Sequence, residues 1–157
     1  MIIPQTEWLV PTEYPDLRSA EEIAIDLETR DPDLKKLGSG AIVGNGEVVG
    51  IAVAVDGWKG YFPIAHEIGP NLDRKKVLDW FTDLCSSPAT KIFHNAMYDV
   101  CWVRNLGIKI NGLIVDTMIA CSVLDENRFA YTLNALSWHY LNEGKNEKAL
   151  KLSLIHI

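Results

Sequence analysis

Residues 22–28, EIAIDLE, alternate aliphatic side chains with small or charged ones. Successive side chains of a β-strand point to opposite faces, so this period of two predicts a strand with one apolar, buried face. Asp26 and Glu28 both fall on the other face, with Cα atoms about 6.5–7 Å apart. That separation suits two carboxylates that share a divalent cation, although a lone Asp-x-Glu pair is more often simply solvated.

Periodicity and turn residues place the other elements. They predict strands at 48–55, 61–66, 91–94 and about 112–115, and helices at 74–85, about 95–105, 116 or 117 to 124, and 133–141. Asp56 and Gly57 predict a hairpin after the second strand. Hairpins followed by strand–helix alternation favour a single α/β domain in which helices cover a mixed sheet. The glycines at 38–44 miss the dinucleotide-binding spacing and precede a strand, which argues against such a site.

The charge balance restricts the possible partners. The formal net charge is −6 and the pI is about 5.1, which argues against binding duplex DNA mainly through Lys and Arg. A nucleic-acid partner would need another source of positive charge, such as bound metal ions. The apolar runs are too short for a membrane segment, and Cys85, Cys101 and Cys121 are odd in number and widely spaced. We therefore expect buried thiols and a soluble, cytoplasmic protein without a membrane partner.

A second group of polar residues lies at 94–99, HNAMYD, where a short strand ends and a helix begins. Asn95 can cap this helix, and Asp99 follows one turn later on about the same side. If the strand before it runs parallel to the strand of Asp26 and Glu28, the three acids meet at one end of the sheet. Such a cluster repels itself, so it implies a cation, and ligation by oxygen alone selects Mg²⁺ or Mn²⁺.

IDLET, HNAMYD and VDTM, in this order and at these separations, resemble the proofreading 3′–5′ exonuclease domain of family A (DNA polymerase I type) DNA polymerases. The details favour a phage enzyme, and the resemblance runs from about Ile23 to about Leu141. It implies a ribonuclease H-like α/β fold, with a five-stranded mixed sheet of order 3-2-1-4-5 and flanking helices.

The resemblance also implies residue roles. Asp26 would bridge two Mg²⁺ or Mn²⁺ ions, Glu28 would bind the ion that activates water, and Asp99 would serve the second ion. These three residues would be both the catalytic acids and the metal ligands.

Further roles concern the substrate and the helix ends. Thr29 would meet the terminal nucleotide through its backbone, and Asn95 would contact the strand near the scissile bond. Tyr98 matches a substrate-side aromatic, with packing as an equal alternative. For Asp116 we favour capping of its own helix over metal binding.

The function implied is proofreading, by two-metal hydrolysis of phosphodiester bonds at a single-stranded DNA 3′ end. The partner would be an attached polymerase domain, and a phage-encoded enzyme would act in the host cytoplasm. One alternative is an RNA 3′-end exonuclease of the ribonuclease D type, which shares the same acids. The other is a non-catalytic, exonuclease-like module that binds nucleic acid.

One motif of the family is missing. These exonucleases carry a Tyr or His followed by an Asp on a late helix, whereas the last Asp of this chain is Asp125. We therefore expect residues 1–20 to form an N-terminal extension and 21–151 an exonuclease domain that is incomplete at its C-terminus, so that the chain is weakly active or inactive. The last six residues, LSLIHI (152–157), match the translation of a transposon end used in sequencing libraries, and we interpret them as an adapter artefact.

Overall fold

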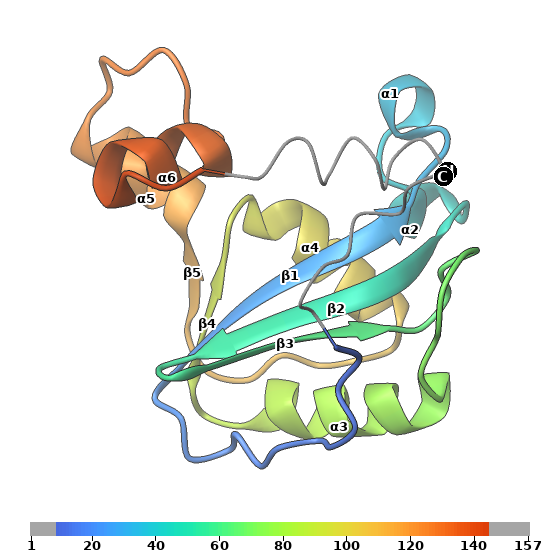
Figure 1. Ribbon diagram of the computed structural model, residues 1–157. Helices are drawn as coiled ribbons and strands as arrows, with labels where there is room; N and C mark the ends of the chain where they lie inside the picture. Colours follow the sequence, from blue (N-terminus) through green and yellow to red (C-terminus); the bar gives the residue numbers. More distant parts are fainter. Residues whose placement is uncertain (1–8, 145–157) are drawn as a thin grey trace, which may run out of the picture. The chain divides into compact units, whose positions relative to one another are not determined.

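The computed structural model describes residues 9–144 (Figure 1). Residues 1–8 and 145–157 lie outside the described part, and with them lie the start of the expected extension and the interpreted adapter segment. The described chain divides into two compact units. One unit is Val10–Thr117, and the other contains Leu9 and residues 118–144.

The first unit is built on a five-stranded mixed sheet. Its strands are β1 (Glu22–Arg30), β2 (Glu47–Val55), β3 (Trp58–Pro63), β4 (Thr90–Phe93) and β5 (Ile114–Asp116). The spatial order is β3-β2-β1-β4-β5, with β1, β2 and β3 antiparallel and β1, β4 and β5 parallel. This confirms the expected strand order and its mixed character.

The helices of this unit are α1 (Leu34–Leu37), α2 (Gly40–Val43), α3 (Arg74–Ser86) and α4 (Ala96–Asn105). Asp73 caps α3, because its carboxylate accepts a hydrogen bond of 3.1 Å from the amide of Lys76. Helix α5 (Thr117–Leu124) starts at the last residue of this unit and continues into the second.

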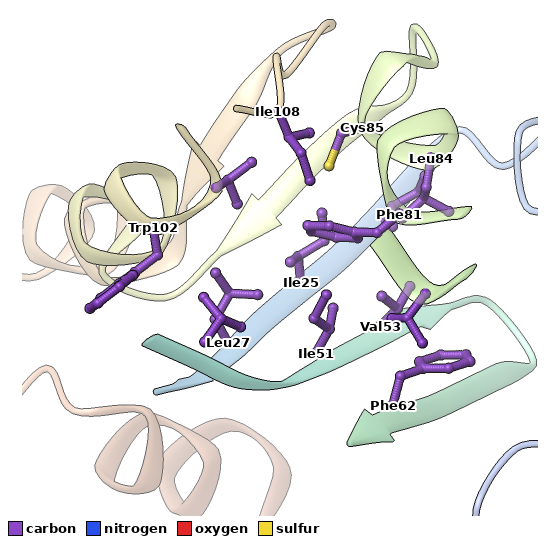
Figure 2. Packing of buried hydrophobic residues seen from close by; sticks show 14 of the residues in the cluster. Ile25, Leu27, Ile51, Val53, Phe62, Phe81, Leu84, Cys85, Trp102 and Ile108 are labelled. Atoms are coloured by element: carbon purple, nitrogen blue, oxygen red, sulfur yellow. The ribbon is translucent and has the colours of Figure 1, made fainter. Parts of the chain in front are cut away.

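The core lies between one face of the sheet and helices α3 and α4 (Figure 2). Strand β1 buries its three aliphatic side chains, as the alternation predicts. They pack in one cluster with side chains that include Ile51, Phe62, Phe81 and Trp102. Burying such side chains stabilises a fold by about 1.5–3 kcal/mol each. Cys85 belongs to this cluster, but Cys101 and Cys121 are only half-buried, so the expectation of three buried thiols was wrong.

Several elements differ from the prediction. Strand β3 starts at Trp58 and not at residue 61, because the turn is only Asp56–Gly57 and the next residue already pairs with Val55. Strand β5 starts after Gly112, whose φ of +82° is incompatible with a strand. Helices α1 and α2 lie in the glycine-rich connector; each is four residues long, too short to show a helical period.

Strand β4, which leads to the second group of polar residues, is anchored by a buried lysine. The Lys91 side chain is fully buried, and its Nζ donates hydrogen bonds of 3.0 Å to the carbonyl oxygens of Ala89 and Asn111 and one of 2.5 Å to that of Ser87. Burial lowers the pKa of Lys91. These bonds join the start of β4 to the chain that leads into β5 and so fix the edge on which α4 begins.

The second unit contains the remainder of α5 and helix α6 (Leu133–Leu141). Thr132 caps α6, since its hydroxyl accepts a hydrogen bond from the amide of Ala135 at 3.3 Å. The loop before it is closed by the hydroxyl of Tyr131, which donates to the carbonyl oxygen of Asp125 at 2.6 Å. In the described range 9–144, no helix is long and apolar enough to cross a bilayer.

Candidate active site

Asp26 and Glu28 project from the face of β1 that points away from the core, and both are exposed. Directly opposed residues of antiparallel strands point to the same face. Asp26 lies opposite Ala52 of β2, and Glu28 lies opposite Gly50. No β2 side chain larger than a methyl group therefore stands beside either carboxylate.

Asp99 reaches the same strand from α4. The ladder between β1 and β4 ends at the pair Ala24–Ile92, and beyond it the backbone amide of Leu27 donates a hydrogen bond of 3.1 Å to the Asp99 carboxylate. The side chain thus takes the place of a neighbouring strand. As predicted, Asp99 is brought beside the segment that carries Asp26 and Glu28, although it is itself only 4% exposed.

The electrostatics of Asp99 follow from this position. Burial raises its pKa to about 7, and the negative charges of Asp26 and Glu28 push the pKa in the same direction. The hydrogen bond from the Leu27 amide opposes this shift by stabilising the charged form. Asp99 is therefore an acid whose negative charge is unfavourable without a compensating cation.

Helix α4 is capped from another strand. Asn95 occupies the N-cap position, as predicted, with a left-handed φ of +69°, but its side chain makes no capping hydrogen bond. Asp116, at the end of β5, accepts hydrogen bonds from the amides of Asn95 (3.1 Å) and Ala96 (2.8 Å). The sequence favoured a cap of its own helix, α5, over metal binding, and both of these roles stay predictions. The Asn95 side chain is exposed at the N-terminus of α4.

Thr29 and Tyr98 are in contact, which the sequence did not predict. Their hydroxyl groups lie 2.6 Å apart, and the Tyr98 hydroxyl also donates to Asp31 at 3.1 Å. The same Asp31 carboxylate accepts a hydrogen bond from the amide of Gly40 at 2.9 Å, which ties in the loop of α1 and α2. Tyr98 thus fixes the end of β1 beside the acidic residues. Its predicted contact with substrate is not tested by this geometry.

His94 completes the edge at the end of β4. Its Nδ1 lies 2.9 Å from the hydroxyl of Thr117, which in turn donates to the carbonyl oxygen of Phe93 at 3.1 Å. Its Nε2 is buried and has no hydrogen-bond partner. His94 is thus held by contacts at the end of its own strand.

Tyr61 of β3 is the residue that sequence reasoning missed. It lies opposite Ala52 of β2, and Ala52 in turn lies opposite Asp26 of β1. Burial raises the pKa of Tyr61, and the negative charges of Glu28 and Asp26 raise it further, so the phenol stays neutral. The signal was present in the sequence, because a two-residue turn at Asp56–Gly57 fixes the register of the hairpin.

Between residues 9 and 144, no three His, Cys, Asp or Glu side chains converge closely enough to form a metal cage. The chemistry of Asp26, Glu28 and Asp99 nevertheless fits a hard divalent cation, because all three offer carboxylate oxygens. The raised pKa of Asp99 also marks a place where positive charge would be stabilising. To hold one ion in common, the three carboxylates would have to move closer together.

Known proteins resemble this chain in sequence. The sequence model of the 3′–5′ exonuclease family matches residues 14–153. A DNA-directed DNA polymerase of Pseudomonas phage M6 is 33% identical over 162 residues, which cover 96% of this chain and 24% of the phage protein. DNA polymerase I of Chloroflexus aurantiacus is 29% identical over 114 residues, covering 71% of this chain and 11% of that protein. The chain thus spans only 24% and 11% of the lengths of these two relatives.

The fold has counterparts among solved structures. Brucella melitensis NrnC with bound Mg²⁺ superposes with a TM-score of 0.58 and 19% identity, and the match covers 83% of this chain and 58% of NrnC. At this identity the likeness concerns the fold alone. Together with the strand order, it confirms the ribonuclease H-like arrangement expected from the sequence.

Proposed function

The chain belongs to the 3′–5′ exonuclease family of A-type DNA polymerases, and on that basis we propose that it hydrolyses phosphodiester bonds at the 3′ end of DNA. Asp26, Glu28 and Asp99 are the acids of the reaction centre, and two Mg²⁺ or Mn²⁺ ions are the cofactors. The relatives named above are DNA polymerases, so we also propose that a polymerase domain is the partner in the full-length protein, which would act in the host cytoplasm if it is phage-encoded.

One observation carries this proposal: the hydrogen bond between the Leu27 amide and Asp99, which attaches the α4 acid to β1 between Asp26 and Glu28. Asp26 and Glu28 present their carboxylates on the exposed face of β1, where the 3′ end of a DNA strand can approach. Asp99 supplies a third negative charge from a buried position. When bound, the divalent ions would neutralise the phosphate and lower the pKa of the attacking water.

The residues around the acids would position the substrate. The hydroxyl of Tyr98 holds the side chain of Thr29, which leaves the β1 backbone at this position ordered for contact with the terminal nucleotide. Asn95 offers an exposed amide at the start of α4, next to backbone amides that already face a carboxylate. An exposed amide side chain can donate to a phosphate oxygen and accept from a base or sugar.

A labelled oligonucleotide tests this function. We expect the chain to shorten 5′-labelled single-stranded DNA one nucleotide at a time from the 3′ end with Mg²⁺ or Mn²⁺, slowly because of the missing third motif, and not in EDTA. Asp26→Asn should abolish the shortening. Asp79→Asn, at an exposed surface ion pair with Lys75, should keep the normal rate. An undiminished rate in Asp26→Asn would refute the assigned role.

The same assay separates the alternatives. Faster trimming of an RNA oligonucleotide of the same sequence would favour the ribonuclease D type. Binding of single strands without cleavage, with an affinity that neither depends on Mg²⁺ or Mn²⁺ nor changes in Asp26→Asn, would favour a non-catalytic module.

A further inference from the structure

We propose that Tyr61, braced by His66, is a positioning residue that holds the carboxylate of Glu28 in the orientation needed for metal binding. This inference rests on the proposed metal site but concerns a residue outside the sequence motifs. It follows from a glycine in β2 and from a hydrogen bond between β3 and the loop after it.

Gly50 opens the path from β3 to β1. Gly50 lies opposite Glu28 of β1 on one side and opposite Pro63 of β3 on the other. A Cβ atom added at Gly50 would lie 1.8 Å from the Tyr61 hydroxyl oxygen and 2.3 Å from Cζ. The end of the phenol therefore occupies the space that a residue-50 side chain would take.

That space lies beside Glu28. The Cβ atoms of directly opposed residues in an antiparallel pair are about 4.5–5.5 Å apart, and Glu28 is opposed to Gly50. The Tyr61 hydroxyl is thus placed within reach of a glutamate side chain.

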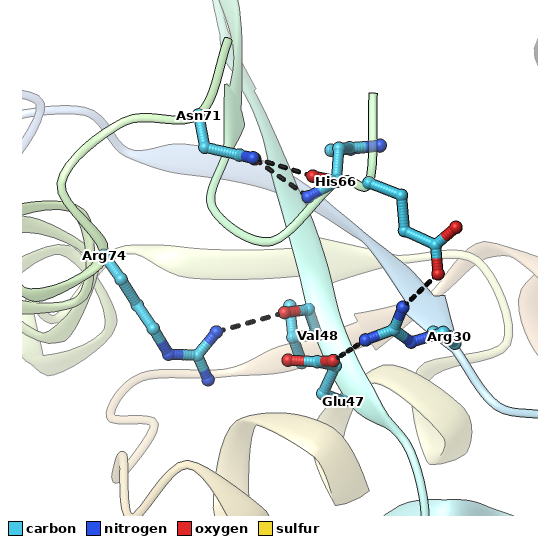
Figure 3. Close-up of polar contacts among 7 residues, drawn as sticks. Arg30, Glu47, Val48, His66, Asn71 and Arg74 are labelled. Atoms are coloured by element: carbon cyan, nitrogen blue, oxygen red, sulfur yellow. Dashed lines mark hydrogen bonds and ion pairs between the residues drawn. The ribbon is translucent and has the colours of Figure 1, made fainter. Parts of the chain in front are cut away.

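The side chain of His66 holds the phenol of Tyr61. Its Nε2 is hydrogen-bonded to the Tyr61 hydroxyl, and the two rings meet edge to face with centroids 5.8 Å apart. The backbone of His66 is itself fixed by Asn71, through two hydrogen bonds of 2.8 Å (Figure 3). The next residue, Glu67, forms an ion pair of 2.5 Å with Arg30 at the end of β1. The loop is therefore tied to the strand that carries Glu28.

The donor properties of these groups give the arrangement a direction. An ionised carboxylate can only accept hydrogen bonds, and a phenol has a single proton. If the phenol donates towards Glu28, the histidine donates to the phenol oxygen from Nε2–H, which in a neutral ring is the tautomer protonated at Nε2. Burial lowers the pKa of His66 and so favours a neutral ring. Hydrogen bonds of this kind orient metal-binding carboxylates, and losing one typically weakens metal binding or activity roughly 10- to 100-fold.

Mn²⁺ affinity and thermal stability, measured on the whole chain, test this role. Tyr61→Phe keeps the ring and removes the hydroxyl, and we expect it to weaken Mn²⁺ binding by roughly 10- to 100-fold with an unchanged Tm in EDTA. Tyr131→Phe removes a hydroxyl that is hydrogen-bonded to Asp125 and should bind Mn²⁺ like the wild type. A purely structural Tyr61 would lower the Tm and leave the affinity of the folded protein unchanged.

Two further variants cover the case in which Tyr61→Phe folds poorly. His66→Phe removes the brace, and Gly50→Ala displaces the phenol; each should weaken Mn²⁺ binding in the same direction. Combining either variant with Tyr61→Phe should weaken Mn²⁺ binding little further, because the effects of mutations within one hydrogen-bond network are not additive.

The outcomes separate this inference from the proposed function. Wild-type binding that is lost in Asp26→Asn but unchanged in Tyr61→Phe, His66→Phe and Gly50→Ala overturns the role of Tyr61 alone. A wild-type chain that binds no Mn²⁺, or whose binding is the same in Asp26→Asn, overturns both.

Discussion

The backbone amide of Leu27 donates a hydrogen bond of 3.1 Å to the carboxylate of Asp99. Leu27 lies between the two acids of β1, and its side chain is buried in the core while its amide faces the edge that β4 leaves open. This hydrogen bond therefore attaches α4 to the part of β1 that carries Asp26 and Glu28. It also buries a carboxylate beside two others, which has consequences for stability and for cation binding.

Asp99 should make the metal-free protein less stable as the pH rises. Its pKa is about 7 in the folded protein and about 3.9 in an unfolded chain. Between these values the folded state binds more protons, so the free energy of unfolding falls by up to about 1.4 kcal/mol per pH unit. Asp99→Asn cannot titrate, yet its side-chain oxygen can still accept the bond from Leu27, so this variant should lose that slope.

Urea unfolding in EDTA between pH 4.5 and 8 measures this effect. Asp79→Asn serves as the matched control, because Asp79 lies on the exposed face of α3 in an ion pair with Lys75, and it should keep the wild-type slope. A slope in Asp99→Asn equal to that of the wild type would show that Asp99 does not cause it.

Asp116 should stabilise α4 although it belongs to β5. Its two oxygens accept the amides of Asn95 and Ala96, and loss of a helix cap typically costs about 0.5–2 kcal/mol. Asp116→Ala should lower the free energy of unfolding by about that amount. Asp73→Ala, at the cap of α3, provides the comparison by chemical denaturation. An unchanged unfolding midpoint in Asp116→Ala would mean that water replaces the carboxylate at no cost.

Asn95 should separate a backbone role from a substrate role. Its φ of +69° is one that glycine adopts without strain, so Asn95→Gly should keep or slightly raise stability, whereas Asn95→Ala should lower it by about 1 kcal/mol. If the exposed amide contacts the DNA, both variants should bind single-stranded DNA more weakly. Fluorescence anisotropy with a short oligonucleotide measures this, and equal affinity in all three proteins would reject the contact.

Local patterns predicted the fold because they encode it directly. The alternation of β1 identifies its buried face, and the turn at Asp56–Gly57 fixes the pairing of β2 with β3. The acids of the site could be predicted because they lie within short motifs. Two contacts between residues distant in sequence were not predicted. Asp116 at the end of β5 accepts a hydrogen bond from the amide of Asn95, which follows the neighbouring strand β4, and the Tyr61 side chain covers Gly50. Such contacts depend on the packed sheet and leave no local period.

The central claim is that Asp26, Glu28 and Asp99 hold a divalent cation. Anomalous scattering from crystals of the chain soaked in Mn²⁺ tests it most directly, because the signal locates the ion without reference to activity. We predict a peak at about 2.0–2.2 Å from carboxylate oxygens of Asp26 and of at least one of the other two acids, which disappears in Asp26→Asn. A peak that lies away from all three carboxylates, or no peak at saturating Mn²⁺, would contradict the account.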